Sequence, residues 1–183
     1  FNVFAEAQDY ADLVVLLPGE THTPGIAPGK VGDPLPVTAG DPVVAQVIAT
    51  DAWWNQVPVQ PQVHFQSDNF FQMITPNDSN LDPDGSASFD LFFKAATAHD
   101  LQVNDLIEPS YVDNSAINVT AGDFDRLMVL LPGEAPQPGG PEPDGKTGSP
   151  IPQTASLEFD VTIRAVDQFW NQINNSSEHV WIA

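Results

Sequence analysis

The chain has 183 residues, with 25 Asp and Glu against five Lys and Arg and a formal net charge of −20 at pH 7. A field of this sign repels nucleic acid and anionic lipid, so neither nucleic acid binding nor membrane insertion is expected. The chain has 42% hydrophobic residues, no cysteine and no run of 18 apolar residues. It can therefore build a packed core without disulfides, and it holds no membrane-spanning segment.

Strand signals dominate the sequence, and 18 prolines and 12 glycines separate them. Alternation of apolar and polar residues is clearest in residues 87–95 and 158–165. In chain order, the expected strands are residues 13–17, 43–50, 62–66, 70–74, 87–95, 100–104 and 116–120. About seven short strands separated by turns predict an all-β fold, an immunoglobulin-like antiparallel β-sandwich.

The same alternation predicts which side chains form the core. In the main set of strands the expected core residues are Val43, Val47, Phe89, Leu91, Phe93, Leu101 and Val103. The equivalent residues further along the chain are Phe159, Val161, Ile163 and Trp170.

The sequence repeats itself. Residues 12–20 (DLVVLLPGE) return as 126–134 (RLMVLLPGE), residues 30–39 as 146–155, and residues 51–57 (DAWWNQV) as 167–173 (DQFWNQI). A period of about 115 residues suits one independently folding domain. We therefore expect tandem domains: residues 1–8 as the last strand of a preceding or neighbouring domain, 9–122 as a complete domain, and 123–183 as the first part of a second repeat.

The incomplete ends have two explanations. Residues 1–7 resemble residues 117–121, and the second repeat stops near the equivalent of Phe65. Either the segment belongs to a longer array, or strand addition between neighbouring copies of the protein completes the domains. In both cases residues 1–5 are expected to pair in a sheet with residues outside 11–122.

The linked blocks at residues 126–134, 145–155 and 159–171 resemble a tandem immunoglobulin-like, filamin-type repeat of large secreted and cell-surface proteins of bacteria. The resemblance covers nearly all of the chain. It implies a structural or adhesive role at the cell surface, and it carries no catalytic residues. The first copy departs from the pattern at Val44 and Ile48, which make the outer face of its second long strand apolar and suggest that a neighbour covers it.

Several repeated residues have direct physical interpretations. Trp54 and Trp170 are expected to plug the sandwich rather than bind sugar. Asp51 with Asn55, and Asp167 with Asn171, are expected to hydrogen-bond the backbone of their own turns. Lys30 and Lys146 are expected to pair with Glu20 and Glu134.

One segment has the spacing of metal ligands. Asp78, Asn80, Asp82 and Asp84 alternate before Gly85, and such a loop can supply several oxygens to Ca²⁺. A closing Glu is absent, and the alternative is a polar turn between strands. A second candidate places an interdomain cation at Asp123, Asp125 and Glu134.

Two functions remain open. The first is a non-enzymatic extracellular stalk, sheath or filament of tandem domains, whose partners are neighbouring copies. The second is a carbohydrate-binding module of a secreted hydrolase, which would stack surface glycans on Trp53, Phe70, Phe71 or Trp181. The sequence contains no Gly-x-Ser-x-Gly, phosphate-loop or His-Glu-x-x-His motif, so an enzyme is not expected.

Overall fold

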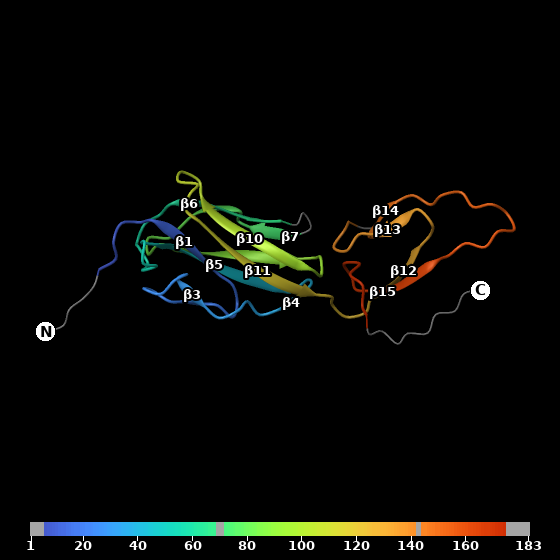
Figure 1. Ribbon diagram of the computed structural model, residues 1–183, viewed down its shortest axis with the longest axis horizontal. Coiled ribbons are helices and arrows are strands. Elements are labelled where there is room, and N and C mark those ends of the chain that lie inside the picture. Colours follow the sequence, from blue (N-terminus) through green and yellow to red (C-terminus); the bar gives the residue numbers. More distant parts are fainter. Residues whose placement is uncertain (1–5, 69–71, 142–143, 175–183) are drawn as a thin grey trace.

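A computed structural model of the protein describes residues 6–68, 72–141 and 144–174. The chain forms an elongated molecule in which a large β-sandwich and the smaller second copy lie end to end (Figure 1). All named elements of these residues are strands, which confirms the all-β class. Within the same ranges no helix is long and apolar enough to cross a membrane.

The sandwich consists of two sheets. The first sheet has the order β1-β5-β9-β7 and the second the order β4-β11-β10-β6-β8. Their bounds are β1 (Asp12–Leu16), β4 (Val37–Thr38), β5 (Pro42–Thr50), β6 (Gln62–Ser67), β7 (Gln72–Thr75), β8 (Asp78–Asn80), β9 (Ser86–Phe93), β10 (Ala98–Asp105) and β11 (Val112–Thr120). Neighbouring strands are antiparallel except β4, which runs parallel to β11. The N-terminal part of the sandwich thus supplies an edge strand to each sheet, β1 to the first and β4 to the second, an arrangement that fits the immunoglobulin-like class.

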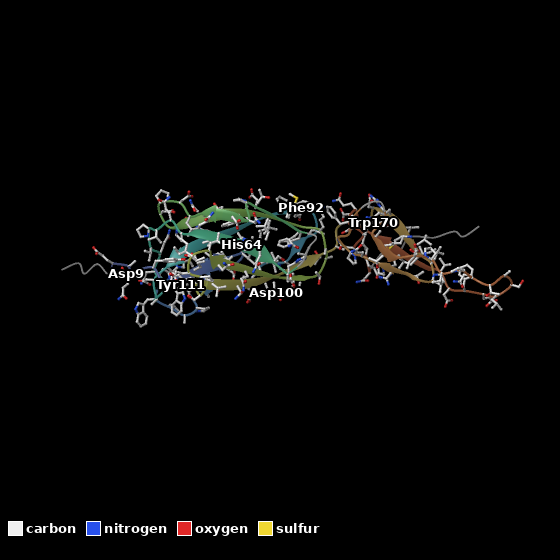
Figure 2. All side chains as sticks on the ribbon, turned by 90° about the horizontal axis from the view of Figure 1, so that it is seen from above. Asp9, His64, Phe92, Asp100, Tyr111 and Trp170 are labelled. Carbon is white, nitrogen blue, oxygen red and sulfur yellow. The ribbon has the colours of Figure 1, made fainter. Side chains whose placement is uncertain are left out.

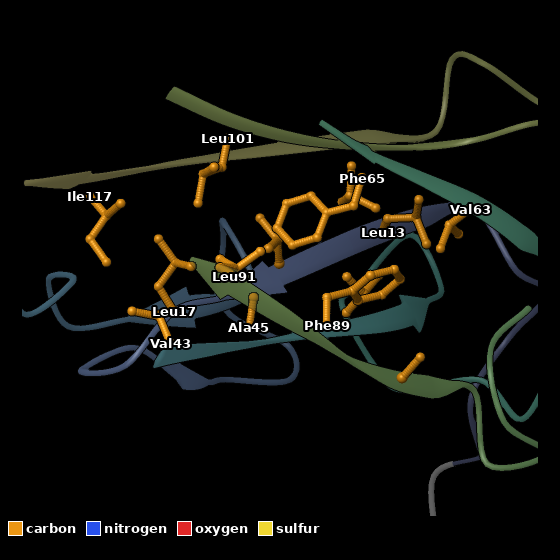
Figure 3. Packing of buried hydrophobic residues seen from close by; sticks show 14 of the residues in the cluster. Leu13, Leu17, Val43, Ala45, Val63, Phe65, Phe89, Leu91, Leu101 and Ile117 are labelled. Atoms are coloured by element: carbon orange, nitrogen blue, oxygen red, sulfur yellow. The ribbon is translucent and has the colours of Figure 1, made fainter. Parts of the chain in front are cut away.

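The core lies between the two sheets (Figure 3). It contains every core residue expected for the main strands: Val43, Val47, Phe89, Leu91, Phe93, Leu101 and Val103. Phe65 and Phe89 meet edge to face with ring centroids 5.2 Å apart. Alternation places these side chains on one face because successive residues of a strand point to opposite sides of the sheet. The core prediction for this part of the chain is confirmed.

Trp54 is not between the sheets, and this corrects the prediction that it plugs the sandwich. It packs on the outer face of β1 and β5, against Val14, Leu16 and Ile48. Trp54 lies in the tight turn after β5 and has a positive φ of 58°. This backbone conformation turns the indole back toward that outer face. Ile48 is therefore covered from within its own domain, whereas Val44 is exposed.

The second copy repeats the start of the sandwich. β12 (Arg126–Leu130) pairs with β15 (Thr162–Val166) as β1 pairs with β5. β13 (Glu134–Pro136) pairs with β14 (Lys146–Gly148) as β2 (Thr21–His22) pairs with β3 (Lys30–Val31). Trp170 lies buried with Met128, Leu130 and Val166, on the face that corresponds to the outer face of the sandwich.

The inner face of the second copy is open, which corrects two core predictions. Phe159 is 49% exposed and Val161 is 42% exposed, and neither belongs to a strand. Ile163 is only partly buried. Their equivalents in the sandwich pair with β9 at Leu91, Phe89 and Ala87. In the described part of the second copy no strand takes the place of β9 beside β15, and no second sheet packs on this face.

Candidate functional site: a joint between the two copies

A tight loop of the second copy, residues 167–171, meets the end of the sandwich. We call it the joint loop. The carboxylate of Asp167 organises it: Oδ1 accepts the N–H of Phe169 at 2.8 Å and of Asn171 at 2.9 Å. Oδ2 accepts from the side-chain amide of Asn171 at 2.8 Å. Both Asp167 and Asn171 are only 1% exposed. Because the loop is held by its own hydrogen bonds, its outer side chains are presented in one geometry.

The joint loop bonds directly to the backbone of the sandwich. The N–H of Ala96 donates to Oδ1 of Asn171 at 2.7 Å, and Nδ2 of Asn171 donates to the carbonyl of Lys94 at 2.7 Å. The N–H of Gly122, in the connection between the copies, donates to Oδ2 of Asp167 at 2.8 Å. One buried amide side chain thereby satisfies a donor and an acceptor just after β9, which is a specific arrangement.

Apolar contacts complete the joint. The rings of Phe169 and Phe92 meet edge to face, with centroids 5.9 Å apart and an angle of 84°, and Phe169 packs against the sandwich core. Figure 2 shows Phe92 at the end of the sandwich nearest the second copy, where Trp170 also lies. The fit requires glycine at Gly40, where an added Cβ would lie 2.6 Å from the Phe169 ring.

The sandwich contains its own copy of this loop at residues 51–55. Asp51 Oδ1 accepts the N–H of Trp53 at 2.8 Å and of Asn55 at 3.0 Å, and Nδ2 of Asn55 donates to Oδ2 at 2.9 Å. Burial would raise the pKa of Asp51, but hydrogen bonds from Gln8, Asn55 and Trp53 outweigh it and lower the pKa to about 2. The prediction that these Asp and Asn pairs hydrogen-bond their own turns is confirmed. The contacts of Asn171 to the sandwich were not predicted.

Lys30 and Lys146, two of the three lysines of the chain, pair with the expected carboxylates. Lys146 Nζ lies 3.0 Å from Glu134 Oε1, and Lys30 Nζ lies 3.7 Å from Glu20 Oε1. Lys30 has a nearer partner in Asp113, at 2.8 Å, which the repeat pattern did not indicate because Asp113 lies on β11. Lys30 Nζ also donates to the carbonyl of Val15 on β1 at 3.0 Å, so the lysine links β1 with β11.

The candidate calcium ligands lie in two different local structures. Asp78 and Asn80 belong to strand β8, and Oδ1 of Asp78 accepts a hydrogen bond from Nδ1 of His64 at 2.6 Å. Asp82 begins a turn closed by the N–H of Gly85 at 2.8 Å, and Asp84 accepts the N–H of Ser86 at 3.0 Å. In the described ranges no group of three or more His, Cys, Asp or Glu side chains is placed to hold a metal. Calcium binding stays a prediction, which chelator-sensitive melting and its loss in Asp82→Ala would test.

The residues of the second cation candidate, Asp123, Asp125 and Glu134, make separate contacts. Glu134 accepts the N–H of Leu131 at 2.8 Å and pairs with Lys146, and these bonds lower the pKa of its carboxyl. Asp125 pairs with Arg126. Asp123 and Asp125 line an open cleft of about 310 Å³ at the joint instead, together with Asp41 and Asp167. The joint is therefore acidic along one side.

The aromatic residues proposed to stack sugars are only partly described. Trp53 is 59% exposed, whereas Phe70, Phe71 and Trp181 lie outside the described residues. The expected pairing of residues 1–5, and the end of the second copy at residues 175–183, also fall outside them.

No protein-family model and no curated protein matches this sequence. Solved structures similar to it include a β-glucuronidase of Parabacteroides merdae (TM-score 0.44, 13% identity, 62% of this chain and 13% of that one). Domains 4–9 of the surface layer protein SbsC are also similar (0.40, 12%, 90% and 21%), as is the D00-D0 domain of intimin (0.39, 15%, 46% and 42%). This chain thus spans less than half the length of each. At these TM-scores the similarities assign no activity to the chain.

Proposed function

We propose that this protein is a non-enzymatic structural or adhesive component of an extracellular surface array, in which immunoglobulin-like domains are joined end to end into a stalk, sheath or filament. The observation that carries the proposal is the joint: a preformed loop that bonds the next sandwich through a buried amide and an aromatic contact. A connection of this kind sets the angle between neighbouring domains, whereas a flexible linker does not.

The charge of the chain fits the same role. A net charge of −20 keeps neighbouring arrays apart and resists non-specific association. The resemblance of the repeated blocks to filamin-type repeats of bacterial surface proteins supports the same location. Neighbouring copies of the protein are the proposed partners.

The open inner face of the second copy supports completion by further strands. Leu127, Val129, Phe159 and Val161 are exposed on it, an apolar surface that a second sheet would bury. We propose that further sequence of the same array, or strand addition from a neighbouring molecule, supplies that sheet. Analytical ultracentrifugation of the 183-residue chain separates the two: strand addition predicts concentration-dependent association, and completion in cis predicts a monomer once the sequence is extended.

Small-angle X-ray scattering of the same chain tests the array. We expect a rod-like particle whose maximum dimension stays constant between low and high salt, because the joint is held by short-range contacts and not by screened surface charges. Scattering that fits two freely jointed bodies would refute the proposal.

A carbohydrate-binding module is the second candidate, favoured by the exposed indole of Trp53. A glycan array separates the two functions. Binding of a glycan that is lost in Trp53→Ala, with the melting temperature unchanged, would support the module, and absence of binding leaves the structural role.

A further inference from the structure

The loop 51–55 at the far end of the sandwich has the same construction as the joint loop. The backbone hydrogen bond from Asp51 to Asn55 measures 2.9 Å, against 3.0 Å from Asp167 to Asn171. The N–H of Gly25 donates to the carbonyl of Trp53 at 2.7 Å, as that of Gly139 does to Phe169 at 2.8 Å. Since β5 begins at the joint and ends at Thr50, this loop lies at the opposite end of the sandwich, near Asp9 and Tyr111 in Figure 2.

Three positions of the joint loop construction, Gly139, Phe169 and Asn171, touch the sandwich. At the far end the equivalent positions have no such contact with the described residues. Trp53, the equivalent of Phe169, is 59% exposed. A Cβ added at Gly139 would lie 2.7 Å from the backbone nitrogen of Ala95, whereas one added at Gly25 would meet nothing within 4 Å. Yet Gly25 keeps the positive φ of 76°. The docking shape of the joint loop is therefore repeated at this end of the sandwich.

The side-chain amide of Asn55 can make further hydrogen bonds. Nδ2 of Asn55 donates to the carboxylate of Asp51, and the amide group has a second hydrogen. Within the described ranges Oδ1 of Asn55 accepts no hydrogen bond. In Asn171 the same two atoms bind Lys94 and Ala96.

The connection that enters the loop is also repeated. The N–H of Gln8 donates to Oδ2 of Asp51 at 2.9 Å, just as the N–H of Gly122 donates to Oδ2 of Asp167 at 2.8 Å. In sequence, residues 3–7 align with residues 117–121, which comprise the end of β11 and the residue that follows it. The residue that precedes each domain thus makes the same hydrogen bond to the loop.

We propose that the loop 51–55, with Gly25, is a docking surface for a second copy of this sandwich placed immediately before Asp9. Trp53 packs on the partner copy's equivalents of Phe92 and Gly40, and Asn55 bonds to those of Lys94 and Ala96. This inference rests on the proposed function, because it takes the joint as the repeating connection of the array. It implies that a sandwich is connected to its neighbours in this way at both of its ends.

The test lengthens the full chain by one sandwich. A copy of residues 9–122 is inserted directly before Asp9, so that Gly122 of the added copy takes the place of Gln8. Amide hydrogen exchange is then measured for Ala96 of the added copy and for the original Ala96, which serves as the internal reference. We expect both amides to exchange at similar rates, at least about tenfold slower than an Ala96 amide without a partner, which corresponds to about 1.4 kcal/mol of protection.

Two variants make the result specific. Gly25→Asn in the original sandwich is tolerated in the 183-residue chain, because Asn adopts positive φ and the space is open. In the lengthened chain it must place its Cβ against the added copy, so it should remove the protection of the added Ala96 alone. Trp53→Ala should weaken the same protection without lowering that of the original Ala96.

The outcomes separate the two proposals. A fast added Ala96 beside a protected original Ala96 overturns the docking surface and leaves the proposed function intact. Fast exchange of both amides overturns both proposals. Protection of the added amide that survives Gly25→Asn and Trp53→Ala also overturns the docking surface, since another contact would then be responsible.

Discussion

Replacing Asn171 by alanine should open the joint. The substitution removes the two bonds to Ala96 and Lys94, at 2.7 Å each, and the bond to Asp167 at 2.8 Å. Each hydrogen bond contributes about 0.5 to 1.5 kcal/mol net, and more where a group is left buried without a partner. Ala96 and Lys94 are only partly buried, so water can reach them once the joint opens.

The lower part of that range therefore applies to the joint. We expect the opening equilibrium to shift by about 1 to 3 kcal/mol, or about 5- to 150-fold. The assay is hydrogen exchange of the Ala96 amide in the full chain, with small-angle scattering to detect the loss of a fixed angle.

Asn55→Ala is the matched control. Asn55 makes the same bonds within its own turn but contacts no second sandwich in the described part of the chain. It should cost a similar amount of loop stability and leave Ala96 protected. Because Asn171→Ala could also loosen the second copy itself, exchange of the β12 and β15 amides is followed in parallel. Unchanged exchange of Ala96 in Asn171→Ala, or equal acceleration by Asn55→Ala, would refute the reasoning.

Three further predictions concern the loops and the outer face. Trp54→Ala should lower the free energy of unfolding by about 2 to 4 kcal/mol in urea titrations, because it uncovers the outer face of β1 and β5; a change below about 0.5 kcal/mol would contradict that packing. The lowered pKa of Asp51, about 2, stabilises the fold above the unfolded pKa near 4, and this stability is lost as pH falls toward 2. Thermal melts across that range should show a weaker pH dependence in Asp51→Asn, and an identical dependence would count against the loop's role. Gly40→Ala, at φ 93° and 2.6 Å from the Phe169 ring, should accelerate Ala96 exchange, whereas Gly25→Ala pays only the backbone strain and should not.

Much of the fold could be predicted from local patterns. Alternation marks Val43, Phe89, Leu91 and Val103 as inward-facing, because the period of two in a strand is a property of the backbone. The repeated Asp and Asn at 51 and 55 also predict their turn, since short polar side chains bond the backbone a few residues away. These features depend on residues close together in the sequence, so the sequence by itself determined them.

The tertiary structure decided what those local elements meet. Trp54 and Phe159 were both expected in a core, yet one lies on an outer face and the other is exposed. A pattern says which side of a strand is apolar, but burial needs an opposing sheet, and the described part of the second copy contains none. The joint likewise depends on Asn171 meeting Ala96, residues 75 positions apart. The repeat predicted the loop, and only the packing of one domain end on the next could show that its outer side is a connection.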